Sequence, residues 1–70
     1  MKYLIVFEKT GTGYSAYSPD IDGCVATGST KDEVERNMKE AIEFHLEGLK
    51  LERQEIPRPN SYSDYLEVSA

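Results

Sequence analysis

The sequence predicts a small α+β fold with the element order β-β-β-α-β, in which one helix lies on one face of a four-stranded mixed sheet. Two observations support this prediction. Residues 30–53 have the periodicity of one long amphipathic helix, and the segments on both sides of it contain short aromatic or β-branched runs that are typical of strands. The chain has 70 residues, so we expect one domain spanning residues 1–70.

The first predicted strand is Tyr3–Glu8, which is apolar on both faces because Leu4 and Val6 point away from its odd-numbered residues. This pattern is typical of a central strand that is covered on both sides. The glycines of Lys9–Gly13 favour a tight turn after it. A phosphate-binding loop is disfavoured there, since neither a Lys-Ser/Thr pair nor a helix start follows the glycines.

Two further strands are predicted before the helix. Tyr14–Ser18 alternates tyrosine with small residues, and the proline and glycine of Pro19–Gly23 end this strand. Cys24–Gly28 is short and rich in residues that favour strands. Because short loops connect all three strands, we expect them to form an antiparallel meander.

The helix is predicted over Lys31–Arg53. Thr30 and Glu33 have the spacing of a capping box, in which the hydroxyl and the carboxylate satisfy free amides at the helix start. We expect Met38, in the middle of the apolar stripe, to be buried against the sheet. The other residues expected to share this core are Ile42 and two of Tyr3, Ile5 and Phe7.

The segment after the helix is predicted to contain a connector and a fourth strand. Glu55–Pro59 is expected to be extended, because its prolines lack amide protons and restrict the residues before them. Tyr65–Val68 then alternates apolar and polar residues. A right-handed helical crossover would place this strand parallel to the first strand, in the sheet order 3-2-1-4. This order is that of a partial ribonuclease-H-like fold.

One helix covers only one face of such a sheet. Leu4 and Val6 are therefore left without cover on the opposite face. A second copy of the chain is the simplest cover, so we expect a homodimer or a higher homo-oligomer that associates through these two residues.

The charge of the chain restricts its partners. Thirteen acidic residues and eight basic residues give a formal net charge of −5. This disfavours direct binding of nucleic acid, which needs clustered Lys and Arg, and suits a basic protein partner. A single cysteine excludes an internal disulfide, and the N-terminus has too few apolar residues for a signal peptide or a membrane span. We therefore expect a cytoplasmic protein without a membrane partner.

Catalytic and metal-binding groups are sparse. Nothing in the sequence links Cys24 to His45, the only histidine, as a nucleophile and its base. A lone histidine is more often a core or interface residue than a metal ligand. Glu8, Asp20 and Asp22 are candidates for a carboxylate nuclease, but the first strand has no carboxylate in its middle, and such a site needs several converging oxygens. We expect no enzyme, no metal and no cofactor.

Most of the chain carries a pattern that resembles the HicB-type antitoxins. The matching residues are Gly13-Tyr14, Ser18-Pro19-Asp20-Ile21-Asp22-Gly23-Cys24, Gly28-Ser29-Thr30, Glu33, Ala41-Ile42 and Ile56-Pro57-Arg58-Pro59. In that family a strand ends in the sequence Pro-Asp-Leu-Pro-Gly-Cys. A second short strand then ends in a three-residue motif, which is Gly, then Asp or Ser, then Thr, and a long helix follows. Asp22 stands where the family usually has proline, a change that a loop tolerates.

The resemblance implies the antitoxin of a type II toxin–antitoxin pair. Such a protein binds a HicA-type toxin, a small basic mRNA-cleaving ribonuclease, and blocks its catalytic surface. Many members carry a C-terminal DNA-binding domain, and because the chain stops at Ala70 we expect no direct contact with nucleic acid. The expected toxin-binding residues lie in the loop between the second and third strands: Pro19, Asp20, Asp22, Gly23 and Cys24.

Two other functions stay open at this level. An orphan homodimer with a structural or regulatory role would have the same fold and no toxin. A carboxylate nuclease would need acids that converge on one metal site. A neighbouring gene for a small basic protein with one histidine would distinguish the antitoxin from the orphan homodimer.

Overall fold

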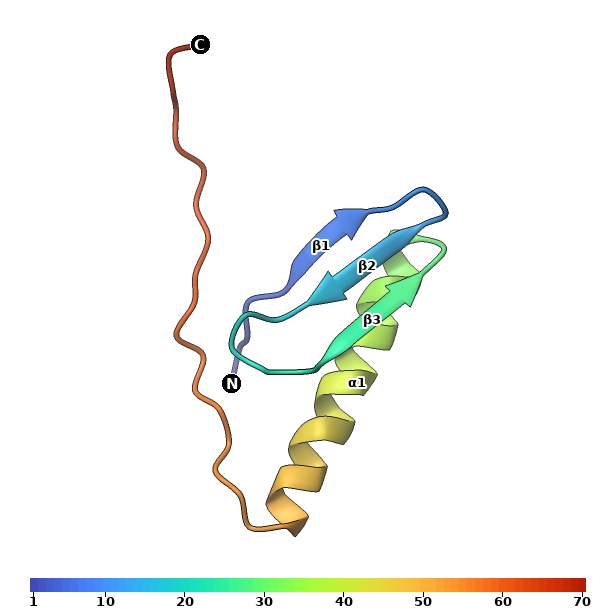
Figure 1. Cartoon of the computed structure of the whole chain (residues 1–70), viewed down its shortest axis with the longest axis vertical. Coiled ribbons are helices and arrows are strands. Elements are labelled where there is room, and N and C mark those ends of the chain that lie inside the picture. The colour runs from blue at the N-terminus through green and yellow to red at the C-terminus, as the bar shows by residue number, and fades with distance from the viewer.

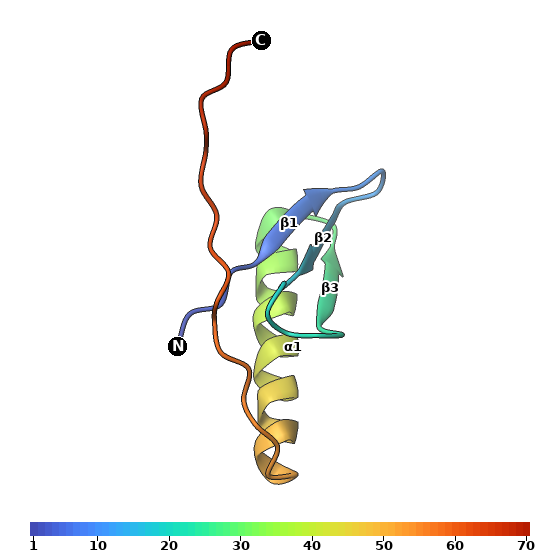
Figure 2. The ribbon, with the colours of Figure 1, turned by 60° about the vertical axis from the view of Figure 1, so that its left-hand side comes forward.

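The computed structural model describes residues 1–70 and contains three strands and one helix (Figure 1). The strands β1 (Val6–Lys9), β2 (Tyr14–Tyr17) and β3 (Val25–Gly28) form an antiparallel sheet in the order β1-β2-β3. The helix α1 (Lys31–Leu51) lies across one face of this sheet. Residues 54–70, which we call the tail, leave the end of α1 and run in an extended conformation past the sheet (Figures 1 and 2).

The register of the sheet aligns side chains in rows across the three strands. The row that faces α1 contains Phe7, Ala16 and Ala26. The neighbouring row faces the other way, because successive residues of a strand point to opposite faces. We call it the outer row, and it contains Val6, Tyr17 and Val25.

The core lies between α1 and the strands β2 and β3. Its buried apolar residues are Ala16, Ile21, Cys24, Val34 and Met38. Val34 and Met38 lie one turn apart on the same side of α1, as the predicted apolar stripe requires. The predicted burial of Met38 is confirmed, with 1% of its surface exposed. The helix does not combine the length and apolarity that crossing a bilayer requires.

The other predicted core residues are less covered than expected. Ile42, Tyr3 and Ile5 are half-buried and pack against the core, whereas Phe7 is 45% exposed. The reason is the position of α1, which packs over β2 and β3 and makes no close backbone contact with β1. Side chains on β1 therefore reach only the margin of the core.

The strand β3 approaches α1 closely at Gly28. A Cβ atom at this position would lie 2.6 Å from the amide nitrogen of Val34 and 2.9 Å from its Cα. Backbone atoms cannot move aside like a flexible side chain, so this contact requires glycine. Nearby, the side-chain amide of Asn37 donates to the carbonyl of Thr27 at 2.9 Å and attaches the helix to the same strand.

The predicted capping box is present at the start of α1. The amide of Glu33 donates to the hydroxyl of Thr30 at 3.1 Å, and the carboxylate of Glu33 accepts from the amide of Ser29 at 2.9 Å. The carboxylate thus reaches one residue further back than the usual capping box. The hydroxyl of Thr30 satisfies an amide of the first helical turn, and the carboxylate of Glu33 satisfies the amide just before the helix cap.

The helix ends at Leu51, two residues before the predicted end at Arg53. Arg53 has φ of 57°, in the left-handed region, and its amide donates to the carbonyl of Lys50. The amide of Gln54 donates to the carbonyl of Leu49 at 2.8 Å. These two hydrogen bonds form a Schellman motif, which turns the chain out of the helix. The motif uses arginine where glycine is usual, which is why the sequence did not indicate it.

The strands are shorter than predicted at the end of the sheet next to the β2–β3 loop. The register stops where Val6, Tyr17 and Val25 lie opposite one another. The chain turns away at the proline that follows Ser18, so Tyr3–Ile5 have no strand beside them. The predicted strand starts at Tyr3 and Cys24 and the predicted end at Ser18 were therefore wrong.

The predicted fourth strand was also wrong. Tyr65–Val68 pairs with no other strand, so the sheet has three antiparallel strands and not the four-stranded mixed order 3-2-1-4. The last part of the tail runs apart from β1 in both views (Figures 1 and 2). Two contacts described below hold the beginning of the tail and direct it away from its own sheet. A ribonuclease-H-like arrangement, which needs the parallel strand, is not confirmed.

Replacing Met38 with alanine tests the core. We expect Met38→Ala to lower the free energy of unfolding by about 2–5 kcal/mol, because it leaves a cavity between α1 and the sheet. Urea denaturation followed by circular dichroism measures this change. Lys39→Ala, at the exposed neighbouring position, is the control and should change stability by less than about 0.5 kcal/mol. Equal effects of the two substitutions would contradict this description of the core.

Candidate functional site

The loop Ser18–Cys24 joins β2 to β3 and contains all the toxin-binding residues predicted from the sequence. The core holds this loop at two points, since Ile21 is 1% exposed and Cys24 is 5% exposed. Between them, Gly23 has φ of 72°, a left-handed conformation that favours glycine. The backbone of the loop is therefore fixed by burial and by one turn residue, and it presents its remaining side chains in defined positions.

Asp20 uses its carboxylate to hold the tail. Its Oδ2 accepts from the backbone amides of Asn60 and Ser61 at 3.1 Å and 2.9 Å, and its Oδ1 accepts from the hydroxyl of Ser61 at 2.9 Å. These hydrogen bonds, with the Ser61 backbone amide the strongest cause, hold the pKa of Asp20 below its ordinary value, although partial desolvation acts in the opposite direction. Asp20 is thus occupied by the chain's own backbone.

A second contact fixes the tail four residues earlier. The hydroxyl of Tyr3 donates to the carbonyl of Pro57 at 2.6 Å, and Ile56 and Pro57 are half-buried. Together, the contacts of Tyr3 and Asp20 hold residues 57–61 beside the N-terminal segment and the β2–β3 loop. We call these two contacts the tail anchors.

A surface hollow of about 510 Å³ lies between the β2–β3 loop and the C-terminal half of α1. Its margin includes Gly23 from the loop, Val25 from β3, and Phe44, His45 and Glu52 from α1. We call it the loop hollow. Val25 is 67% exposed and Phe44 is 80% exposed. Exposed apolar side chains bordered by polar and charged groups are typical of protein–protein interfaces.

Cys24 and His45 both line the loop hollow, but their setting does not suit nucleophilic catalysis. Burial raises the pKa of the Cys24 thiol above its ordinary value. A reactive cysteine needs the opposite shift, because the thiolate is the nucleophile. The thiol is therefore a small apolar core group.

The structure separates the five predicted toxin-binding residues into three groups. Pro19, Asp22 and Gly23 are exposed and accessible to a partner. Asp20 is half-buried and holds the tail, and Cys24 is buried in the core. Only the first group is free for contact in this conformation.

Two exposed apolar residues next to the loop were missed by the sequence reasoning. Phe44 and Val25 border the loop hollow. The signal that could have found Phe44 is its position outside the apolar stripe of the helix, where a large aromatic side chain cannot reach the core. Val25 could not be assigned, because the face of a short strand depends on its register.

The predicted self-association residues lie on the sheet face away from α1. Leu4 and Val6 are both half-buried in the single chain. Val6 belongs to the outer row, whose other members Tyr17 and Val25 are 41% and 67% exposed. The sheet face away from α1 thus carries an apolar stripe in which Tyr17 and Val25 are exposed.

The acidic side chains do not form a metal site. No group of three or more His, Cys, Asp or Glu side chains lies close enough together to hold a metal ion. Glu8 is at the end of the sheet that carries the β1–β2 hairpin, whereas Asp20 and Asp22 lie in the loop at the other end (Figure 1).

These features define a class of protein. A three-stranded sheet backed by one helix carries a firmly held loop beside exposed apolar residues, on a chain with a net charge of −5. This is a small acidic α+β domain with an exposed apolar surface beside a fixed loop.

Comparison with known proteins identifies the family. The family model described as HicB-like antitoxin of bacterial toxin–antitoxin systems matches residues 3–69. The chain therefore belongs to the HicB-like antitoxin family, as its resemblance predicted.

Three proteins of known sequence or structure are similar to this chain. An uncharacterized 14.9 kDa protein of Haemophilus phage HP1 is 41% identical over 94% of this chain, which spans only 50% of the phage protein. A UPF0150 protein of Thermoplasma acidophilum is 40% identical over 87% of this chain and 90% of its own length. Among solved structures, a chain of the HicA3 and HicB3 toxin–antitoxin complex is similar, with a TM-score of 0.72 and 38% identity. That match covers 86% of this chain and 70% of the other.

The Asp20 contact predicts a pH-dependent tail. Because the folded-state pKa of Asp20 lies below the unfolded value of about 3.9, the contact is fully present above that value and is lost as the pH falls through the folded-state pKa. We expect the NMR signal of the Ser61 amide proton to titrate with a midpoint below about 3.9.

Two substitutions in the same loop test this assignment. Asp20→Asn should abolish the titration of the Ser61 amide and increase the fast motion of residues 57–61, measured by NMR relaxation. Asp22→Asn is the control, because Asp22 is exposed and makes no hydrogen bond to the tail. A Ser61 amide that titrates unchanged in the Asp20→Asn variant would show that another group holds the tail.

Proposed function

We propose that this chain is the antitoxin of a type II toxin–antitoxin pair, which binds a small basic HicA-type ribonuclease in the cytoplasm and blocks its catalytic surface. The observation that carries the proposal is the likeness to a chain of the HicA3 and HicB3 complex, at 38% identity over 86% of this chain. At that identity the likeness extends beyond the fold to many of the side chains on it. Membership of the HicB-like antitoxin family supports the same role.

The contact surface in this proposal is the loop hollow together with the exposed part of the β2–β3 loop. Phe44 supplies the exposed apolar area that a binding hot spot needs, and Val25 borders the hollow where β3 begins, although its side chain belongs to the outer row. Pro19, Asp22 and Gly23 supply a loop whose backbone does not have to be ordered on binding, since the core already holds it. The surface therefore combines apolar anchors with a fixed acidic margin.

Charge complementarity supports a basic partner. A ribonuclease must present cationic groups to hold the phosphates of RNA. A cover with a net charge of −5 is attracted to the same groups and competes with RNA for them. Inhibition in this form needs only occupancy, so we propose that the chain is not an enzyme and that it binds no nucleic acid directly.

Two substitutions that change the net charge by the same amount test the contact surface. Asp22→Lys should slow association with the cognate toxin several-fold, and the effect should shrink as salt is added, because screening weakens steering between surface charges. Glu8→Lys changes the net charge by the same amount at the opposite end of the sheet, so it should have a much smaller effect. Surface plasmon resonance at two ionic strengths measures both rates. Equal slowing by the two substitutions would place the contact elsewhere.

Phe44→Asp tests the apolar part of the surface. We expect it to speed dissociation of the toxin by at least about tenfold, since hot-spot residues act mainly on the dissociation rate. The substitution should leave the fold intact, because 80% of the Phe44 surface is exposed. An unchanged circular dichroism spectrum is the control for folding.

The antitoxin activity itself is tested in cells and in vitro. Coexpression with the small basic protein encoded beside it should restore growth, and the two proteins should copurify.

The chain alone, with Mg²⁺ or Mn²⁺, should leave RNA intact. If no toxin is neutralised, the proposal fails and an orphan binding module stands. RNA cleavage that Asp22→Asn abolishes would instead support the nuclease.

A further inference from the structure

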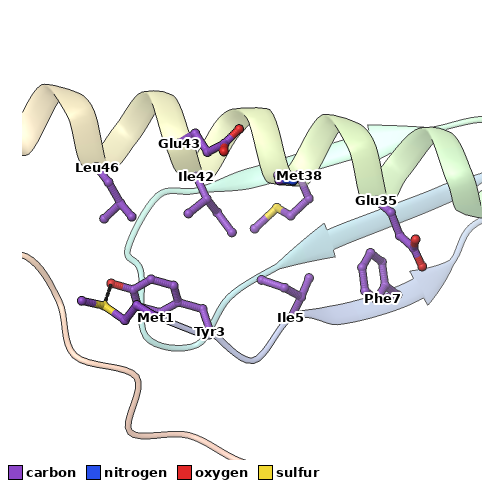
Figure 3. Close-up of a pocket in the computed structure, with 10 residues that line it drawn as sticks. Met1, Tyr3, Ile5, Phe7, Glu35, Met38, Ile42, Glu43 and Leu46 are labelled. Carbon is purple, nitrogen blue, oxygen red and sulfur yellow. Dashed lines mark hydrogen bonds between the residues drawn. The ribbon is translucent and has the colours of Figure 1, made fainter.

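An apolar groove lies beside β1, on the other side of α1 from the loop hollow. It has a volume of about 320 Å³ and is lined by two facing rows of side chains (Figure 3). One row is Tyr3, Ile5 and Phe7, and the other is Met38, Ile42 and Leu46. We call it the edge groove. It exists because α1 packs over β2 and β3 and leaves the margin of the sheet at β1 uncovered.

The strand that borders this groove also has a free edge. β1 pairs only with β2, so the amides and carbonyls along its other side have no strand partner. Such an edge accepts an additional strand readily. A strand added there would place every second side chain against the groove, because alternate residues point to one face.

The tail has the composition expected of a strand that could pair with the free edge of β1. In a single chain, however, no other segment covers the apolar side chains of the tail. Its large apolar residues are exposed: Tyr62 by 86%, Tyr65 by 100%, Leu66 by 82% and Val68 by 76%. Leu66 and Val68 are two residues apart, so in a strand they project to the same face. The radius of gyration is 14.0 Å, against about 11 Å for a compact chain of this length.

The tail anchors direct this segment away from its own groove. The contacts of Tyr3 and Asp20 hold residues 57–61, and Pro57 and Pro59 keep the connector extended. Beyond Ser61 the tail continues outward and ends far from the sheet in both views (Figures 1 and 2). A rigid hinge that separates a strand from its own sheet favours exchange of that strand between identical chains.

We propose that two copies of this chain exchange their tails, so that residues 62–68 of each copy pair with the free edge of β1 in the other. Leu66 and Val68 then fill the edge groove of the second copy, and the backbone of the tail pairs with β1. Each copy gives its tail to the other copy and receives the other's tail in its own edge groove. The two contacts are identical, so the exchange closes as a dimer with twofold symmetry.

This arrangement accounts for features that the single chain leaves unexplained. The sheet gains a fourth strand next to β1, as the sequence predicted, but the strand comes from the partner. Tyr65 has the opposite parity to Leu66, so it projects to the sheet face that carries Val6 and extends the outer row. Leu4 and Val6 then lie next to the interface, which agrees with their predicted part in self-association.

Light scattering across a concentration series tests the dimer. We expect twice the chain mass of 7.9 kDa. Leu66→Asp should raise the dissociation constant of the dimer at least tenfold, because it places a charge in the edge groove, while the helical circular dichroism signal is retained. Phe44→Asp is the matched control, since it puts the same charge on an equally exposed apolar position in the loop hollow and should leave the dimer intact.

Isotope-filtered NMR tests the exchange on the unmodified protein. Labelled and unlabelled chains are denatured together and refolded. We expect intermolecular contacts between the methyl groups of Leu66 and those of Ile5 or Ile42. A mass of one chain, contacts within one chain only, or dissociation by Phe44→Asp and not by Leu66→Asp would each overturn the proposal. The proposal does not depend on a toxin, because both experiments use this chain alone.

Discussion

The packing of one side of α1 on β2 and β3 is the interaction on which the rest of this structure depends. Val34 and Met38 are buried there, and the absence of a side chain at Gly28 lets the helix approach the sheet closely. A single helix cannot cover three strands evenly, so close contact with β2 and β3 leaves β1 at the margin. The edge groove and the exposed outer row both follow from this choice, since no other element is present to cover them.

The β2–β3 loop shows how one short motif supports both the fold and a binding surface. Ile21 and Cys24 attach it to the core, and the carboxylate of Asp20 attaches the tail to it. These contacts leave Pro19 and Asp22 exposed on a backbone that is already fixed. A partner that binds such a loop does not have to order it, which reduces the entropic cost of association.

The two proposed interfaces use different flanks of α1. The loop hollow lies along Phe44 and Glu52, whereas the edge groove lies along Met38, Ile42 and Leu46, and no lining residue is shared. The two proposed interfaces therefore use different residues, and a dimer formed by exchanged tails would carry two copies of the loop hollow. Self-association in this form would also cover apolar surface that a domain of this size cannot bury alone.

The sequence by itself determined the helix, its cap, the burial of Met38, the order of the first three strands and the family. Each depends on local periodicity or on residues close together in the chain. The tertiary structure alone decided the end of α1 and the roles of Asp20 and Cys24. It also decided that Tyr65–Val68 has no partner within its own chain. These outcomes depend on contacts such as that between Asp20 and Ser61, 41 residues apart. Sequence periodicity reports which face of an element is apolar, but it does not report which distant group will meet that face.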